Sequence, residues 1–238
     1  MSGKHSIIEQ RVGLLIVFTL MIVSFGALVE IVPLFWQEET TEPHQNLRPY
    51  TALEMAGRDI YIREGCHVCH TQMVRPLRAE TERFGPYNVA GEDVWEHPFL
   101  WGSKRTGPDL SRVGLRPITE QWHREHLRDP RLVVPESNMP GYPWLAKNTV
   151  KWNTMKRTLE VFKNHFGVPY TDEDIAEQMA LVAGEKVSPT QDTAKLLASQ
   201  ASKYVTADSK SLADATEEDA LVAYLFSLGH ARKEDAHR

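Results

Sequence analysis

The first strong pattern along the chain is an apolar stretch near the N-terminus. Residues 12–29 carry no charged side chain and are rich in Leu, Ile, Val and Phe, and after Glu30 the apolar character continues to Trp36. A helix that crosses the hydrocarbon layer of a membrane needs about 20 residues. A cleaved signal peptide would have a shorter apolar part, followed by a small-residue cleavage site. We therefore favour an uncleaved transmembrane anchor within residues 1–36.

The charges on either side of this stretch predict its orientation. Lys4 and Arg11 precede it, whereas Glu38 and Glu39 follow it. By the positive-inside rule, the N-terminus then lies in the cytoplasm and the remainder of the chain lies outside.

Helical periodicity returns in two short segments that mirror one another. Thr51 and Glu54 form a capping box that predicts a helix from Ala52 to about Glu64. Thr216 and the acids after it predict a last helix, for which Gly229 is a natural stop. Gly57 disfavours a helix relative to alanine, so we expect another helix to approach closely there.

Further helices are expected between these two. A short one runs from Thr119 to about Asp129. A longer one has Trp152, Met155, Leu159, Phe162 and Phe166 on one face. Two more are marked by Ile175, Met179 and Val182, and by Ala194, Leu197, Ala201 and Tyr204. We expect all of them to pack around the domain that the first and last helices build.

Composition limits the classes of function. The chain has 238 residues and a net charge of −5. It has no basic run that would suggest nucleic acid, and no glycine-rich phosphate loop. The predicted organisation is an N-terminal stub and anchor over 1–36, a linker over 37–50, one domain over 51–229 and a polar tail over 230–238.

The candidate chemistry is concentrated in the segment Cys66-His67-Val68-Cys69-His70, which holds the only two cysteines of the chain. Two cysteines two residues apart and followed at once by histidine are typical of a c-type haem attachment site. Both thiols would form thioethers, and His70 would ligate the iron. The alternatives are a disulfide, half of a zinc site, which lacks a second cysteine pair, and a redox pair, which would sit near a βαβ pattern.

A sixth iron ligand is then needed. Met139 lies in an irregular, proline-rich loop over residues 135–143, where a stiff backbone can direct the sulfur at the iron. Met155 and Met179 fall in helical patterns and are more simply core residues. His123 and His126 are the alternative ligands, although we expect them to be ordinary, partly exposed residues of a helix.

Several long segments resemble a known family. They are residues 58–66, 69–76, 97–110, 122–123 and 135–144, and they are similar to the monohaem cytochrome c subunit (subunit II) of cbb3-type cytochrome c oxidases. The likeness covers the anchor and nearly all of residues 48–228. Residues 184–215 depart from it, because they look longer and more polar than the family pattern.

The resemblance implies a mainly α fold, with one transmembrane helix followed by a helical haem domain like that of class I cytochromes c, with extra helices. In such cytochromes the first and last helices cross near the haem, which here would place Gly57 and Tyr61 against Tyr224 and Leu225. The Pro108 carbonyl would accept the second ring N–H of the ligating histidine, a contact that orients the ring.

The resemblance also implies the cofactor and its surroundings. One low-spin haem c would be held by Cys66 and Cys69 and ligated by His70 and Met139. Further contacts with the cofactor are implied for the residues Trp101, Arg105 and Pro108.

The function that the resemblance implies is electron transfer within a terminal oxidase of the bacterial inner membrane, with the haem domain in the periplasm. Electrons would come from a dihaem membrane cytochrome c subunit or a soluble cytochrome c. They would pass to the b-type haem of a polytopic catalytic subunit, and this chain would hold no oxygen-reduction site. The alternatives are a free membrane-anchored electron shuttle and a haem enzyme or gas sensor. The extra residues beyond a minimal cytochrome argue against the shuttle.

Overall fold

We describe a computed structural model of the chain over residues 5–40, 42–102, 104–184 and 212–232. The described residues are mainly helical and contain no β-strand, as the sequence predicted. The chain divides into two compact units, Met1–Glu42 and Pro43–Arg238. The predicted helix around Ala194 to Tyr204 and the end of the polar tail lie outside the described residues.

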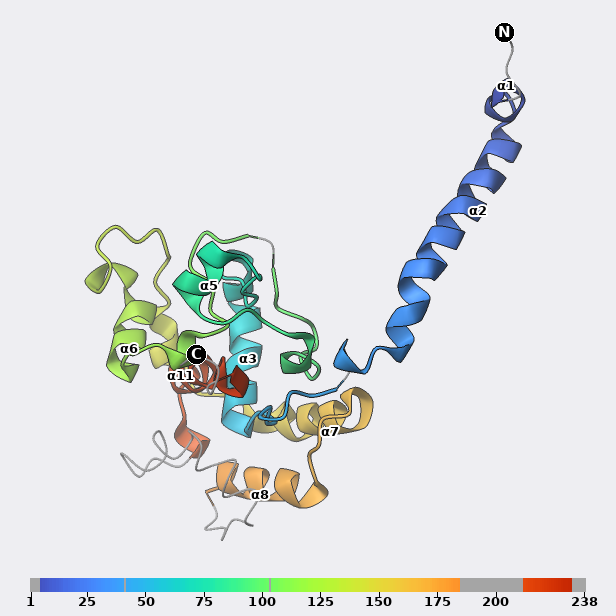
Figure 1. Ribbon diagram of the computed structural model, residues 1–238. Coiled ribbons are helices and arrows are strands. Elements are labelled where there is room, and N and C mark those ends of the chain that lie inside the picture. The colour runs from blue at the N-terminus through green and yellow to red at the C-terminus, as the bar shows by residue number, and fades with distance from the viewer. Residues whose placement is uncertain (1–4, 41, 103, 185–211, 233–238) are drawn as a thin grey trace. The chain divides into compact units, whose positions relative to one another are not determined.

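The first unit is dominated by one long helix, α2, over Val12–Ile31 (Figure 1). A short helix α1 (His5–Glu9) precedes it, and a 3-10 turn over Val32–Trp36 follows, with Pro33 near its start. No residue of α2 is buried within the described structure, and Val12–Trp36 is long and apolar enough to cross a membrane. An apolar helix without an internal packing partner fits the predicted anchor.

The second unit is built on a crossing of two helices. Helix α3 (Ala52–Arg63) begins at the predicted capping box of Thr51 and Glu54, and α11 (Glu217–Ser227) begins at Thr216. They lie side by side (Figure 1).

Contact at the crossing is close. A Cβ at Gly57 would lie 1.9 Å from the carbonyl oxygen of Ala220, which only glycine avoids, and the rings of Tyr61 and Tyr224 are 5.4 Å apart. The expected approach of the first and last helices at Gly57 is therefore confirmed.

Besides the short turn α4 (Cys66–Cys69), the described residues form four longer helices between α3 and α11 in the sequence. They are α5 (Arg78–Phe84), α6 (Glu120–Arg128), α7 (Met155–Phe166) and α8 (Asp172–Val182). Short 3-10 turns connect them at Ala90–Glu92, Val113–Leu115, Pro130–Leu132, Pro143–Ala146, Trp152–Thr154, Leu212–Asp214 and His230–Arg232. Helix α5 is the one that the periodicity did not predict, because only Glu80 and Phe84 of it are buried.

The extra helices α7 and α8 pack on the crossing, as expected. Met155, Leu159 and Phe162 of α7 join the same core as α3 and α11. The N–H of Ala52 donates to Oε1 of Gln178 of α8, so α8 completes the start of α3. Phe166 departs from the predicted buried face, since it is exposed and stacks on His97 instead.

Residues 43–50 are held to the second unit. Arg48 pairs with buried Glu54 at 2.6 Å, and the Tyr170 hydroxyl donates to the carbonyl oxygen of Tyr50. The second half of the predicted linker is thus fastened to the domain that it precedes.

Candidate haem site

The two cysteines lie on a single helical turn, α4 (Cys66–Cys69), directly after α3. Gly65 separates the two helices with a φ of 74°, a left-handed conformation that favours glycine. Both thiols are free, Cys66 half-buried and Cys69 exposed. Burial raises the pKa of the Cys66 thiol to about 12, so that this thiol is protonated at neutral pH.

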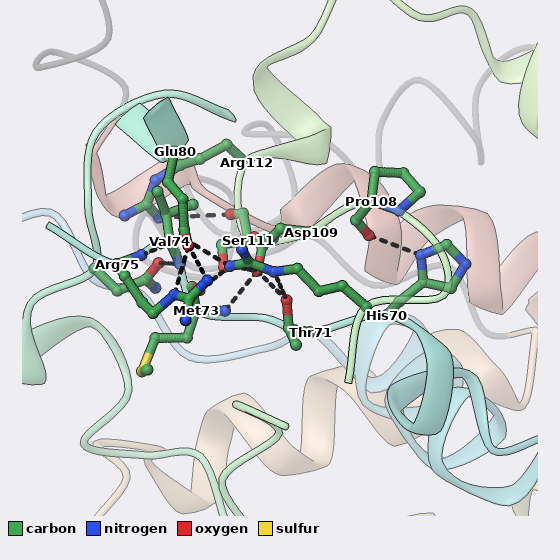
Figure 2. Close-up of polar contacts among 12 residues, drawn as sticks. His70, Thr71, Met73, Val74, Arg75, Glu80, Pro108, Asp109, Ser111 and Arg112 are labelled. Carbon is green, nitrogen blue, oxygen red and sulfur yellow. Dashed lines mark hydrogen bonds and ion pairs between the residues drawn. The ribbon is translucent and has the colours of Figure 1, made fainter. Parts of the chain in front are cut away.

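The ring of His70 is held on one side by a second chain segment. Its Nδ1 lies 2.8 Å from the carbonyl oxygen of Pro108 (Figure 2). A carbonyl only accepts, so Nδ1 carries the proton and Nε2 is left with a lone pair. Gly107 gives the ring its room, because a Cβ there would lie 2.3 Å from Cε1 of His70.

Burial lowers the pKa of His70, and the Pro108 hydrogen bond and the charge of Asp109 oppose that shift. Two other imidazoles are half-buried, those of His67 and His126. Among the described residues, Nδ1 of His67 and Nδ1 of His126 are buried without a hydrogen-bond partner.

Met139 lies in the predicted irregular loop. Its side chain is partly buried against the hydrophobic core, and its N–H donates to Oγ of Ser137. The loop is fastened at its end, because the N–H of Tyr142 donates to the carbonyl oxygen of Leu127, and Gly141 packs closely on Arg128. The ligation of iron by Met139 stays a prediction.

The alternative ligands His123 and His126 lie on α6, as expected. His123 is not partly exposed, however, so that interpretation was wrong. It is 5% exposed, meets Phe226 of α11 edge to face, and has no hydrogen-bond partner for Nε2 among the described residues. Burial, and then the charges of His126 and Arg116, lower its pKa to about 4.

Arg105 and Trp101 both have partners within the protein. Arg105 donates from Nε to Oγ1 of Thr71 and from Nη2 to Glu80. Trp101 donates from Nε1 to Asp93 and stacks on Phe99. Their predicted contacts with a cofactor stay predictions.

The donor set fits a covalently held haem better than it fits zinc. In the part of the chain that the structure describes, no cluster of three or more His, Cys, Asp or Glu is arranged to hold a metal ion. A structural zinc ion needs about four such donors. Two thiols on one turn and a histidine with Nε2 left open are what a haem bound at this motif would use.

Sequence interpretation missed several residues around the site. Gly107, Asp109 and Thr71 each take part in contacts that hold the two segments around His70, and none of the three was given a role in the site. The signal was present, because Gly107 and Asp109 flank Pro108 directly. Their roles appear only once the chain is folded, since Thr71 and Asp109 are 38 positions apart.

A helical domain with a Cys-x-x-Cys-His turn, together with an apolar helix among the described residues that is long enough to span a membrane, is typical of monohaem, membrane-anchored cytochromes. Residues 5–231 match the family described as cytochrome c oxidase, mono-heme subunit/FixO, and the chain belongs to that family. This confirms the resemblance seen in the sequence. No curated protein matches the chain.

Proposed function

We propose that this oxidase subunit carries one haem c and acts by transferring electrons. Cys66 and Cys69 would hold the porphyrin by thioethers, and Nε2 of His70 and the sulfur of Met139 would ligate its iron. The bound group supplies a reversible one-electron step at iron. His and Met ligation favours a low-spin iron with a raised potential.

The chain's own residues set the conditions for that step. Pro108 accepts the Nδ1–H of His70 and so fixes the tautomer and orientation of the ring. Gly107 leaves the space that the ring occupies. With Met139 in the sixth position there is no open site for oxygen, so this subunit does not itself reduce oxygen.

The proposed route begins at a dihaem membrane cytochrome c subunit or a soluble cytochrome c. The subunit passes the electron on to the b-type haem of the polytopic catalytic subunit. Its N-terminus lies in the cytoplasm, α2 crosses the inner membrane once, and the haem domain lies in the periplasm, in keeping with the basic residues before α2 and the acidic ones after it.

One observation carries this proposal. The ring of His70 follows two cysteines on one turn and is oriented through Nδ1, which leaves Nε2 for iron. Membership of the family then indicates that the electron transfer takes place within a cytochrome c oxidase.

The test is the order of reduction in the intact oxidase. Rapid anaerobic mixing with a reduced cytochrome c should show the c-type band of this subunit appearing before the b-type bands. If the b-type haems become reduced first, while this subunit lags, the proposed route is wrong.

A further inference from the structure

Two chain segments meet at His70 and are tied together on both sides of its hydrogen bond. The N–H of Gly107 donates to the carbonyl oxygen of Cys69 at 3.1 Å, and the N–H of Leu110 donates to that of Thr71 at 2.9 Å. The Pro108 carbonyl therefore has a fixed place relative to the ring.

Asp109 links the same two segments through its side chain. It is 0% exposed. Its Oδ2 accepts the hydroxyl of Thr71 at 2.5 Å and the N–H of Met73 at 2.9 Å, while Oδ1 accepts the N–H of Ser111 at 2.9 Å (Figure 2). The hydroxyl and the two N–H groups all donate hydrogen bonds to the carboxylate, an arrangement that suits its ionised form.

The two side chains joined by the hydrogen bond between Thr71 and Asp109 belong to residues next to His70 and Pro108 in the chain. Thr71 follows His70, and Asp109 follows Pro108. The Asp109 side chain therefore closes a ring of contacts that contains the His70–Pro108 hydrogen bond. Moving the carboxylate would move the carbonyl that orients the imidazole.

A cation partly balances this buried charge. Nη2 of Arg105 lies 3.4 Å from Oδ2 of Asp109 and 2.8 Å from Glu80. Arg105 is shared with Glu80, which also pairs with Arg75, and Nη2 of Arg116 donates to the carbonyl oxygen of Asp109. Among the ion-paired side chains of Asp109, Glu80, Arg105 and Arg75, that of Asp109 is the least exposed, so its charge lies in the most poorly hydrated place. Charges interact strongly there, since the effective dielectric constant is low.

We propose that Asp109 is a positioning residue for His70, and that its buried carboxylate lowers the reduction potential of the iron that His70 ligates. This inference rests on the proposed function, because it needs a haem on Cys66 and Cys69. A negative charge favours the ferric state over the ferrous one. A fixed acceptor on Nδ1 also raises the basicity of the ligand, which acts in the same direction.

The test measures the midpoint potential of the full chain with its haem attached, by optical titration in detergent. Asp109→Asn keeps the size of the side chain and removes the charge, so it should raise the potential. Arg105→Gln removes the opposing charge and should lower it. The near-infrared band of sulfur ligation should persist in both, which shows that the axial ligands are unchanged.

Glu54→Gln is the matched control. Glu54 is also buried, at 1% exposed, and pairs with Arg48. It lies at the start of α3, about 14 Å along the helix from Arg63, before the haem motif begins. Its replacement should leave the potential unchanged.

The opposite directions of the two potential shifts separate an effect of charge from a loosening of the structure around His70. Loosening of the site would shift Asp109→Asn and Arg105→Gln in the same direction. A fall or no change in Asp109→Asn would overturn the inference. If Asp109→Asn does not accumulate, Arg105→Gln decides alone, and an unchanged or raised potential overturns it. A wild-type chain without covalent haem would instead refute the proposed function.

Discussion

The two sides of the candidate site are built differently. On the His70 side, two segments are joined by backbone hydrogen bonds and by the buried carboxylate of Asp109. On the Met139 side, an irregular loop is fastened to α6 at one end, through Gly141 and Tyr142, and the N–H of Met139 donates to Ser137 within the loop. The difference indicates a rigidly placed histidine, and it predicts that Met139, if it is the sulfur ligand we propose, is easier to displace.

The largest effect is expected from filling the space beside the His70 ring, which tests whether the His70 side is rigid. Gly107→Ala would place a Cβ within 2.3 Å of the ring. The ring or the backbone must then shift, at a cost of about 1–3 kcal/mol or more. We expect loss of the His70–Pro108 bond and strongly reduced haem incorporation, measured by haem staining of denatured protein.

A control for Gly107→Ala is Gly141→Ala, which places a Cβ 2.5 Å from the carbonyl oxygen of Arg128 on the other side. It should disturb the Met139 loop and leave the haem attached. Full haem incorporation in Gly107→Ala would show that the His70 side is not rigid.

The second change removes the proposed sulfur ligand. Met139→Leu should keep the haem attached, open the sixth position and lower the potential. The ferric protein should lose its weak near-infrared band, as measured by absorption spectroscopy. Met155→Leu and Met179→Leu are the controls, and a band lost in either of them instead would identify a different sulfur.

The third prediction concerns pH and the burial of His123 on α6. Burial lowers its pKa to about 4, from about 6.5 in an unfolded chain. Above pH 6.5 the imidazole is neutral in both the folded and the unfolded chain, so it does not change the free energy of unfolding. Between pH 6.5 and 4 only the unfolded chain gains the proton, so the free energy of unfolding falls as pH falls, by about 3 kcal/mol in total.

His123→Gln should remove this part of the pH dependence in denaturant titrations at several pH values. Exposed His165 provides the control, since His165→Gln should leave the dependence as in the wild type. An identical slope in wild type and His123→Gln would mean that the imidazole is solvated.

The smallest effects are expected from removing one hydrogen bond on each side and comparing the loss in the free energy of unfolding. Thr71→Val leaves the buried Asp109 carboxylate without one donor, at about 1–3 kcal/mol. Ser137→Ala removes a part-buried acceptor from the N–H of Met139, at about 0.5–1.5 kcal/mol. Denaturant unfolding should rank Thr71→Val as the more destabilising, and the reverse order would contradict the asymmetry.

Local patterns predicted much of the fold because their signals are local. The capping residues Thr51 and Thr216 each begin a helix, and Gly57 marks the helix crossing. The haem motif is equally local, since five consecutive residues carry it.

The polar framework behind the site was not predictable in the same way. Asp109 bonds to Thr71 across 38 positions, and Arg105 turns to Glu80 across 25. Such pairs leave no period in the sequence. His123 was misjudged for a related reason, because its burial depends on Phe226 of α11 and not on its own helix.

The central claim is that this chain holds one haem through two thioethers at Cys66 and Cys69. The most direct measurement is the intact mass of the full chain after denaturation and extraction with acidified acetone. The account predicts the mass of the polypeptide plus one haem, with the extract colourless. A mass of the bare polypeptide with haem in the extract would contradict it.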